Sequence, residues 1–199
     1  SKWVRAYNSG GTHAPRIADG WMIFDDSRMV YALTSNASFN NLLDDTQGQR
    51  YRLQVHVKAL PSETRRPGFF QWAVTTGTRK LDSRQTGLIW SHYFRSDKNP
   101  HVYLTAYGQQ SGVRTNAYRY DLEPSQDADN DVWYTFYFDS QEVAVYASTH
   151  GYDDGDQALL GKYKHGISDI TADGNVYFKL YSGSYMIDEI SLSRPGEKN

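Results

Sequence analysis

The 199-residue sequence contains no cysteine, which excludes disulfide bridges and thiolate metal sites. A chain of this length can bury a substantial core without cross-links, so the absence of disulfides says little about its compartment. No apolar run approaches the roughly 20 residues that span a bilayer. No signal peptide is visible from Ser1, so we expect a chain that is either mature or intracellular.

The sequence also lacks an excess of charge of one sign, because it contains 21 basic and 23 acidic residues and its formal net charge is −2. This balance argues against a dedicated nucleic-acid-binding protein. No glycine-rich loop follows a predicted strand, which argues against a nucleotide-binding enzyme. The six histidines show no tight ligand spacing, so no catalytic metal site is expected.

Helical periodicity is missing as well, and short alternating runs separated by Gly, Pro, Asn and Asp clusters take its place. This pattern is typical of a β-sandwich or barrel. Residues 157–165 are predicted to form one helical turn. The tail 194–199 is expected to fray. The predicted strands are Trp21–Phe24, Met29–Leu33, Tyr51–Ala59, Phe69–Thr75, Gly87–Phe94, His101–Tyr107, Ala117–Leu122, Trp133–Asp139, Glu142–Ser148, Val176–Tyr181 and Tyr185–Ser193.

We find no internal repeat and no linker, so residues 1–199 are predicted to form one all-β domain, a two-sheet antiparallel jelly-roll sandwich. The hairpin-like pair Trp133–Asp139 and Val143–Tyr146, and the closing run Tyr185–Leu192, resemble the concanavalin A-like lectin/glucanase superfamily and related carbohydrate-binding modules. Tyr51–Ala59 and Phe69–Val74 are similar to the paired inner strands of such domains. The alternative fold is the galactose-binding-like jelly roll.

Strand alternation separates core positions from candidate site positions. In Tyr51–Ala59, one side carries Leu53, Val55, Val57 and Ala59, and the other carries Arg52, Gln54, His56 and Lys58. An ordinary solvated strand face is the simpler interpretation of this polar strip. Similar outward positions on other strands are Gln71, Thr75, His101, Tyr103, Thr105, Tyr107, Tyr177, Lys179 and Tyr181.

In Gly87–Phe94 the alternation leaves two choices, because either Trp90 and His92, or Ser91, Tyr93 and Arg95, face outward. If all these polar sides belong to one sheet, they form a locally basic groove without carboxylates. We expect such a groove to attract an anionic ligand.

A glycoside hydrolase is disfavoured, since that reaction normally needs two positioned carboxyl groups. The Glu-x-Asp-x-x-Glu run of the superfamily's glucanases is absent. Asp188 and Glu189 are adjacent in a predicted strand, so they are expected to face opposite ways.

A second resemblance indicates β-elimination on a uronic-acid-containing polysaccharide. Gln54-Val-His56 resembles the Gln-x-His strand of jelly-roll alginate and glucuronan lyases, and the run from Tyr177 to Gly183 resembles their Tyr-Phe-Lys strand. The resemblance implies that Gln54 binds the sugar carboxylate and that His56 neutralises it or acts as the base. Tyr181 or Tyr185 would then shuttle the proton.

The Arg-x-Glu-x-Arg strand of such lyases is absent, and Arg52, Arg79, Arg84 and Arg95 are alternative candidates for its arginine. The predicted catalytic residues are therefore His56, Tyr181, Tyr185 and Arg52. The predicted substrate-binding residues are Gln54, Lys58, Gln71, His92, Tyr103, Tyr107, Tyr177 and Lys179.

The alternative function is a non-catalytic carbohydrate-binding module that stacks an extended polysaccharide on exposed aromatics such as Tyr103, Tyr107, Trp72 or Trp90. A structural or adhesive β-domain without a defined site ranks below both. No cofactor is needed for the chemistry, although the Asp-rich loops 127–131 and 153–156 could hold a structural Ca²⁺. The chain is expected to be secreted or extracellular and monomeric, with an anionic polysaccharide as its partner and no nucleic acid or membrane.

Overall fold

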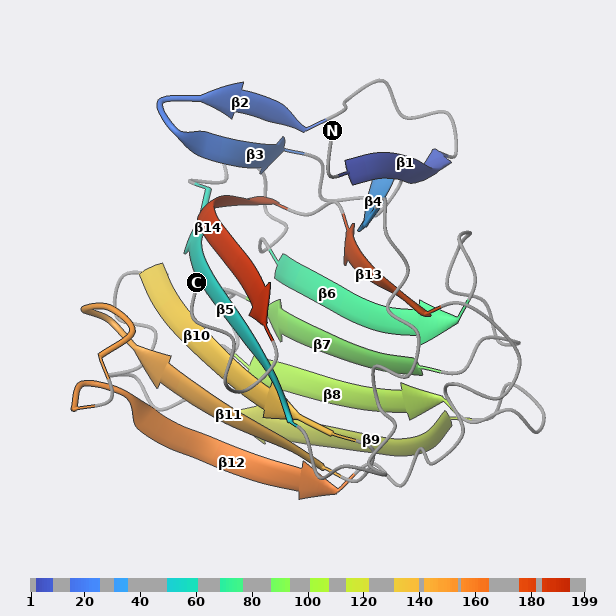
Figure 1. Cartoon of the computed structure of the whole chain (residues 1–199), viewed down its shortest axis with the longest axis vertical. Coiled ribbons are helices and arrows are strands. Elements are labelled where there is room, and N and C mark those ends of the chain that lie inside the picture. The colour runs from blue at the N-terminus through green and yellow to red at the C-terminus, as the bar shows by residue number, and fades with distance from the viewer. Residues whose placement is uncertain are drawn as a thin grey trace.

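The fold was analysed in a computed structural model, in which two seven-stranded antiparallel sheets stack into a sandwich (Figure 1). The structure describes the backbone of residues 3–8, 15–25, 31–35, 50–60, 69–76, 87–93, 101–107, 114–121, 131–139, 142–153, 155–164, 176–181 and 184–193. Side chains are described at 15–25, 50–60, 70, 72, 90–92, 131–139, 142–153, 155–164, 180, 185–191 and 193.

Sheet A contains, in spatial order, β1 (Trp3–Asn8), β4 (Tyr31–Ser35), β13 (Val176–Tyr181), β6 (Phe69–Thr76), β7 (Gly87–Tyr93), β8 (His101–Tyr107) and β9 (Arg114–Asp121). Sheet B contains β12 (Ala158–Lys164), β11 (Glu142–Ser148), β10 (Asp131–Phe138), β5 (Tyr51–Ala59), β14 (Ser184–Ser193), β3 (Trp21–Asp25) and β2 (Arg16–Ala18). The predicted antiparallel jelly-roll sandwich is therefore confirmed. No helix in the described part of the chain is long and apolar enough to cross a membrane.

An aromatic layer fills the space between the sheets. Trp72 of β6 and Trp90 of β7 are fully buried, and each meets the ring of Phe136 on β10 edge-on, at centroid distances of 5.1 and 5.2 Å. Leu53, Val55 and Val57 of β5 are also fully buried, as alternation predicts. These contacts assign the inner side of each sheet, and strand alternation then assigns the outer side.

Two strand predictions were wrong. Residues 158–164 form β12, an edge strand paired with β11, where a helical turn was predicted. Its sequence, Ala-Leu-Leu-Gly-Lys-Tyr-Lys, does not alternate cleanly, and its pairing shifts between Val145 and Tyr146. β5 and β6 were expected to pair, but β5 lies between β10 and β14 in sheet B while β6 lies between β13 and β7 in sheet A. Sequence also missed the short strands β1 and β2.

Replacing Phe136 by Ala is expected to reduce the free energy of unfolding by about 3–5 kcal/mol, because it opens a cavity beneath both tryptophans. The matched control is Tyr137→Ala, one residue further along β10, where the ring is half-buried on the outer face beside Tyr146. That change is expected to cost about 1 kcal/mol. Chemical denaturation followed by tryptophan fluorescence measures both, and equal losses would contradict this description of the core.

Candidate functional site

The structure divides the predicted site residues between the two outer faces of the sandwich. Arg52, Gln54, His56 and Lys58 lie on β5 in sheet B, whereas Tyr177, Lys179 and Tyr181 lie on β13 in sheet A. The prediction that these two strips line one groove is wrong. Alternation within each strand was read correctly for β5, but membership of a sheet depends on long-range pairing that alternation does not encode.

On sheet B, His56 is held between two carboxylates. Its Nε2 lies 2.6 Å from Asp131 Oδ1 on β10, and its Nδ1 lies 2.7 Å from Asp188 Oδ1 on β14. Its ring stacks on Trp133 with centroids 3.7 Å apart and planes 8° apart, while Trp21 approaches at 5.1 Å. These neighbours leave the side chain only 8% exposed. Both ring nitrogens are thus engaged, and neither is free to take a proton from a ligand.

Lys58 belongs to the same group of charges. Its ammonium donates a hydrogen bond of 2.9 Å to Asp131 Oδ2, so Asp131 binds two basic side chains. Burial alone would raise the pKa of Asp131, and this is the largest single influence. The hydrogen bonds from Lys58 and His56, together with their charges, act in the opposite direction, and the pKa of Asp131 is lowered overall.

A β-bulge in β14 explains how Asp188 reaches His56. The register shifts between Ile187, which pairs with Val57, and Glu189, which pairs with His56. Two residues, Asp188 and Glu189, therefore stand between core-facing neighbours, and both are exposed. The expectation that these two acids face opposite ways is wrong, because a bulge interrupts the period of two.

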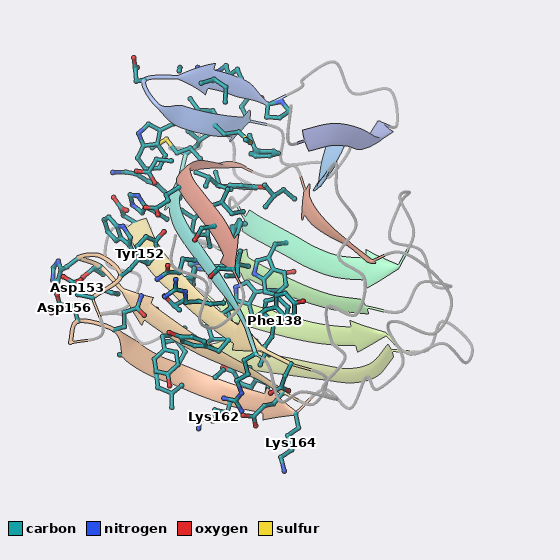
Figure 2. The ribbon with its side chains drawn as sticks, in the orientation of Figure 1. Phe138, Tyr152, Asp153, Asp156, Lys162 and Lys164 are labelled. Atoms are coloured by element: carbon teal, nitrogen blue, oxygen red, sulfur yellow. The ribbon has the colours of Figure 1, made fainter. Side chains whose placement is uncertain are left out.

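Tyr152, in the connection between β11 and β12, lies beside these acids. Burial raises the pKa of its hydroxyl, and the charges of Glu189 and Asp188 raise it further. Figure 2 shows Tyr152 at the same end of sheet B as Asp153 and Asp156. The bulge therefore places two carboxylates, Asp188 and Glu189, beside His56 on the outer face of sheet B, where a groove without carboxylates was expected.

The other predicted residues of sheet B are also committed to internal contacts or lie beside them. Gln54 Nε2 is 3.5 Å from the hydroxyl of Thr135, which accepts a shorter hydrogen bond of 2.8 Å from Gln157. Arg52 is half-buried at the far end of the strip. Sequence reasoning missed the residues that surround His56, namely Asp131, Trp133, Asp188 and Trp21.

Two predicted site residues lie in the core. Tyr185 is fully buried, stacked on Phe24 at 4.6 Å and edge-on to Phe70, and burial raises its pKa well above the ordinary value. His92 is also fully buried, and its Nδ1 lies 2.8 Å from the hydroxyl of Tyr134. Neither side chain can contact a ligand on an outer face, so these assignments are wrong. The choice left open for β7 is settled, since Trp90 and His92 face inward.

On sheet A, backbone register brings the remaining candidates together. Gln71 pairs with Ser91, which pairs with Tyr103, and all three positions alternate with core residues such as Trp72 and Trp90. One row further along, Tyr177 pairs with Thr75, Thr75 with Gly87, and Gly87 with Tyr107. Lys179 and Tyr181 occupy outer positions of β13, alternating with the buried Leu180. Except for Ser91, which is 6% exposed, the side chains at these outer positions lie outside the described residues.

The part of the chain with described side chains contains no group of three His, Asp or Glu residues arranged to hold a metal ion. In the 153–156 loop the amide of Asp156 donates to the carbonyl of Asp153, and Asp154 lies outside the described residues. Residues 127–130 of the other Asp-rich loop lie outside the described residues, while Asp131 is occupied by His56 and Lys58.

No protein-family model and no curated protein sequence matches this chain. Solved structures do match. A legume lectin-like domain from Entamoeba histolytica has a TM-score of 0.65 at 7% identity, covering 96% of this chain and 89% of that one. The exoplasmic/lumenal domain of VIP36, in a form with Ca²⁺ and mannose bound, has a TM-score of 0.63 at 10% identity, covering 100% and 85%.

A prokaryotic β-1,3-1,4-glucanase (lichenase) derived from a mouse hindgut metagenome has a TM-score of 0.52 at 15% identity, covering 93% of this chain and 91% of that one. At these identities the likeness shows the fold alone. The chain has a concanavalin A-like jelly-roll fold, which a legume lectin-like domain and a glucanase share.

Acid titration can test whether Lys58 stabilises the carboxylate of Asp131. A carboxylate with a lowered pKa adds stability above its unfolded value of about 3.9, and that stability is lost as the pH falls through the folded value. Lys58→Met removes one hydrogen bond to Asp131, raises its pKa, and should shift acid unfolding to higher pH. We expect a loss below about 1 kcal/mol at neutral pH, because the Lys58 side chain is 41% exposed and solvent screens its charge.

The control for this titration is Lys162→Met, which removes an exposed lysine from edge strand β12 of the same sheet. Circular dichroism gives the pH of half-unfolding for each variant. If both variants unfold at the wild-type pH, Lys58 does not stabilise the Asp131 carboxylate.

Proposed function

We propose that this concanavalin A-like domain is a non-catalytic carbohydrate-binding module that holds an extended polysaccharide along the outer face of sheet A. The register of sheet A carries the proposal. It aligns the Gln71 and Tyr103 positions in one row across the strands, and the Tyr177 and Tyr107 positions in a neighbouring row. Aromatic rings and amides are the groups that stack on sugar rings and bond their hydroxyls.

The alternative proposal, β-elimination, has less support from the geometry. It needs a base, an acid and a carboxylate-neutralising group within reach of one sugar. His56 has both ring nitrogens bonded to aspartates, Tyr185 is buried, and Tyr181 belongs to the opposite sheet from His56. His56 and Tyr181 are thus separated by the thickness of the sandwich, and Tyr185 lies inside it.

The structural neighbours support binding at the level of the fold. One neighbour is a legume lectin-like domain and another was solved with mannose bound, while the lichenase shows that the same fold also carries a hydrolase. A polysaccharide ligand is also consistent with a secreted or extracellular location, which remains our expectation.

We expect Tyr103→Ala and Tyr177→Ala each to weaken glycan binding by about tenfold or more, because truncating a central aromatic contact typically costs over 1 kcal/mol. The control is Tyr146→Ala, which removes a half-buried tyrosine from the outer face of sheet B. Affinity electrophoresis through gels that contain alginate, polygalacturonate, β-glucan or galactomannan identifies the ligand and ranks the variants. Equal retardation of all three variants and wild type would contradict a site on sheet A.

The same polysaccharides test for elimination by the ultraviolet absorbance of an unsaturated product. We expect no product from wild type, and we expect His56→Ala to lower stability while leaving glycan affinity unchanged. If product accumulates and Tyr181→Phe or His56→Ala slows its formation tenfold, the domain is a lyase and the binding-module proposal is wrong.

A further inference from the structure

Arginine positions occur on β9, the edge strand of sheet A, in the same rows as the proposed glycan-binding positions. Arg119 pairs with Tyr103, which pairs with Ser91, and Ser91 pairs with Gln71. Arg114 pairs with Tyr107, because the register shifts beyond Ala106 and omits one residue of β9. Directly paired residues share a face of a sheet, so both arginine positions belong to the outer face.

Basic residue types outnumber acidic ones across this outer face. On the five adjacent strands β13, β6, β7, β8 and β9, alternation places one lysine and two arginines at outer positions, namely Lys179, Arg114 and Arg119. The same positions include a single carboxylate residue, Asp121.

The outer face of sheet B shows no such excess. Its described acids Asp131, Asp188 and Glu189 lie beside two bases, since Lys58 binds Asp131 and His56 bridges Asp131 and Asp188. Arg52, Lys162 and Lys164 also occupy outer positions of that sheet.

We infer that the polysaccharide bound by sheet A is acidic, with carboxylate or sulfate groups recognised by Arg114 and Arg119 on β9 and by Lys179 on β13. This inference rests on the proposed function and adds the class of ligand. Arginine presents a planar fork of donors that matches a carboxylate or sulfate group, and such charge-assisted bonds are stronger than neutral ones. Four strand spacings of about 4.8 Å separate β13 from β9, which gives roughly 19 Å between the two basic edges. A ligand that meets both is a chain of several sugars.

The test measures the dissociation constants of the full chain for alginate, polygalacturonate and chondroitin sulfate, and for neutral galactomannan and β-glucan. Alginate and polygalacturonate carry carboxylates alone, whereas chondroitin sulfate adds sulfates, so the comparison distinguishes the two anions. The variants are Arg119→Gln, Arg114→Gln and, as a matched control of the same charge change on the opposite sheet, Lys162→Gln. Each is measured at about 0.15 M and about 1 M NaCl, where the screening lengths are about 8 and 3 Å.

We expect an acidic polysaccharide to bind, to weaken by tenfold or more in high salt, and to weaken by about tenfold in each arginine variant but not in Lys162→Gln. Binding of a neutral glycan that is insensitive to salt but lost in Tyr103→Ala would overturn this inference and leave the proposed function intact. Equal effects of Arg119→Gln and Lys162→Gln would show non-specific attraction and also overturn it. If no polysaccharide binds, the proposed function itself fails.

Discussion

The aromatic layer between the two sheets is the constraint on which the rest of the structure depends. Trp72 and Trp90 from sheet A pack edge-on against Phe136 from sheet B, and all three are fully buried. Because side chains alternate along a strand, burying one residue assigns every second neighbour to the outside. The Gln71 position follows from Trp72 in this way, and the Ser91 position follows from Trp90. The packing of the core therefore determines which residues occupy the outer faces of the sheets.

The bulge in β14 interrupts this alternation beside His56. Ile187 and Ile190 both pair with core residues of β5, although two residues separate them. The surplus residue gives the outer face a second carboxylate beside Glu189, and His56 binds it through Nδ1. Bulges re-aim side chains in this manner while leaving the hydrophobic register intact on either side. The second carboxylate that binds His56 is therefore a consequence of one inserted position.

The sequence predicted features that depend on a single strand, and it did not predict features that depend on how strands pair. Alternation correctly identified Leu53, Val55 and Val57 as core, because these residues repeat at a period of two within a single strand. It could not decide which sheet a strand joins, since pairing between β13 and β6 links residues about a hundred positions apart. It also could not locate a bulge, so the interpretation of Asp188 was wrong. His92 and Tyr185 were misplaced because polar atoms on aromatic rings are compatible with burial when the ring packs well, as both do.

Hydrogen bonding gives a physical reason why the part of the sheet B face around His56 is poorly suited to bind a ligand. On the described face of sheet B the polar groups already bind one another: His56 uses both nitrogens, Lys58 binds Asp131, and Thr135 accepts from Gln157. A sugar that bound there would replace protein–protein hydrogen bonds by protein–ligand ones, and such an exchange contributes little net free energy. The same bonds would have to break before any of these groups could transfer a proton. A strip of polar residues on a strand therefore indicates a site only where the neighbouring strands do not already satisfy it, and here β10 and β14 satisfy His56 and Lys58 of the strip on β5.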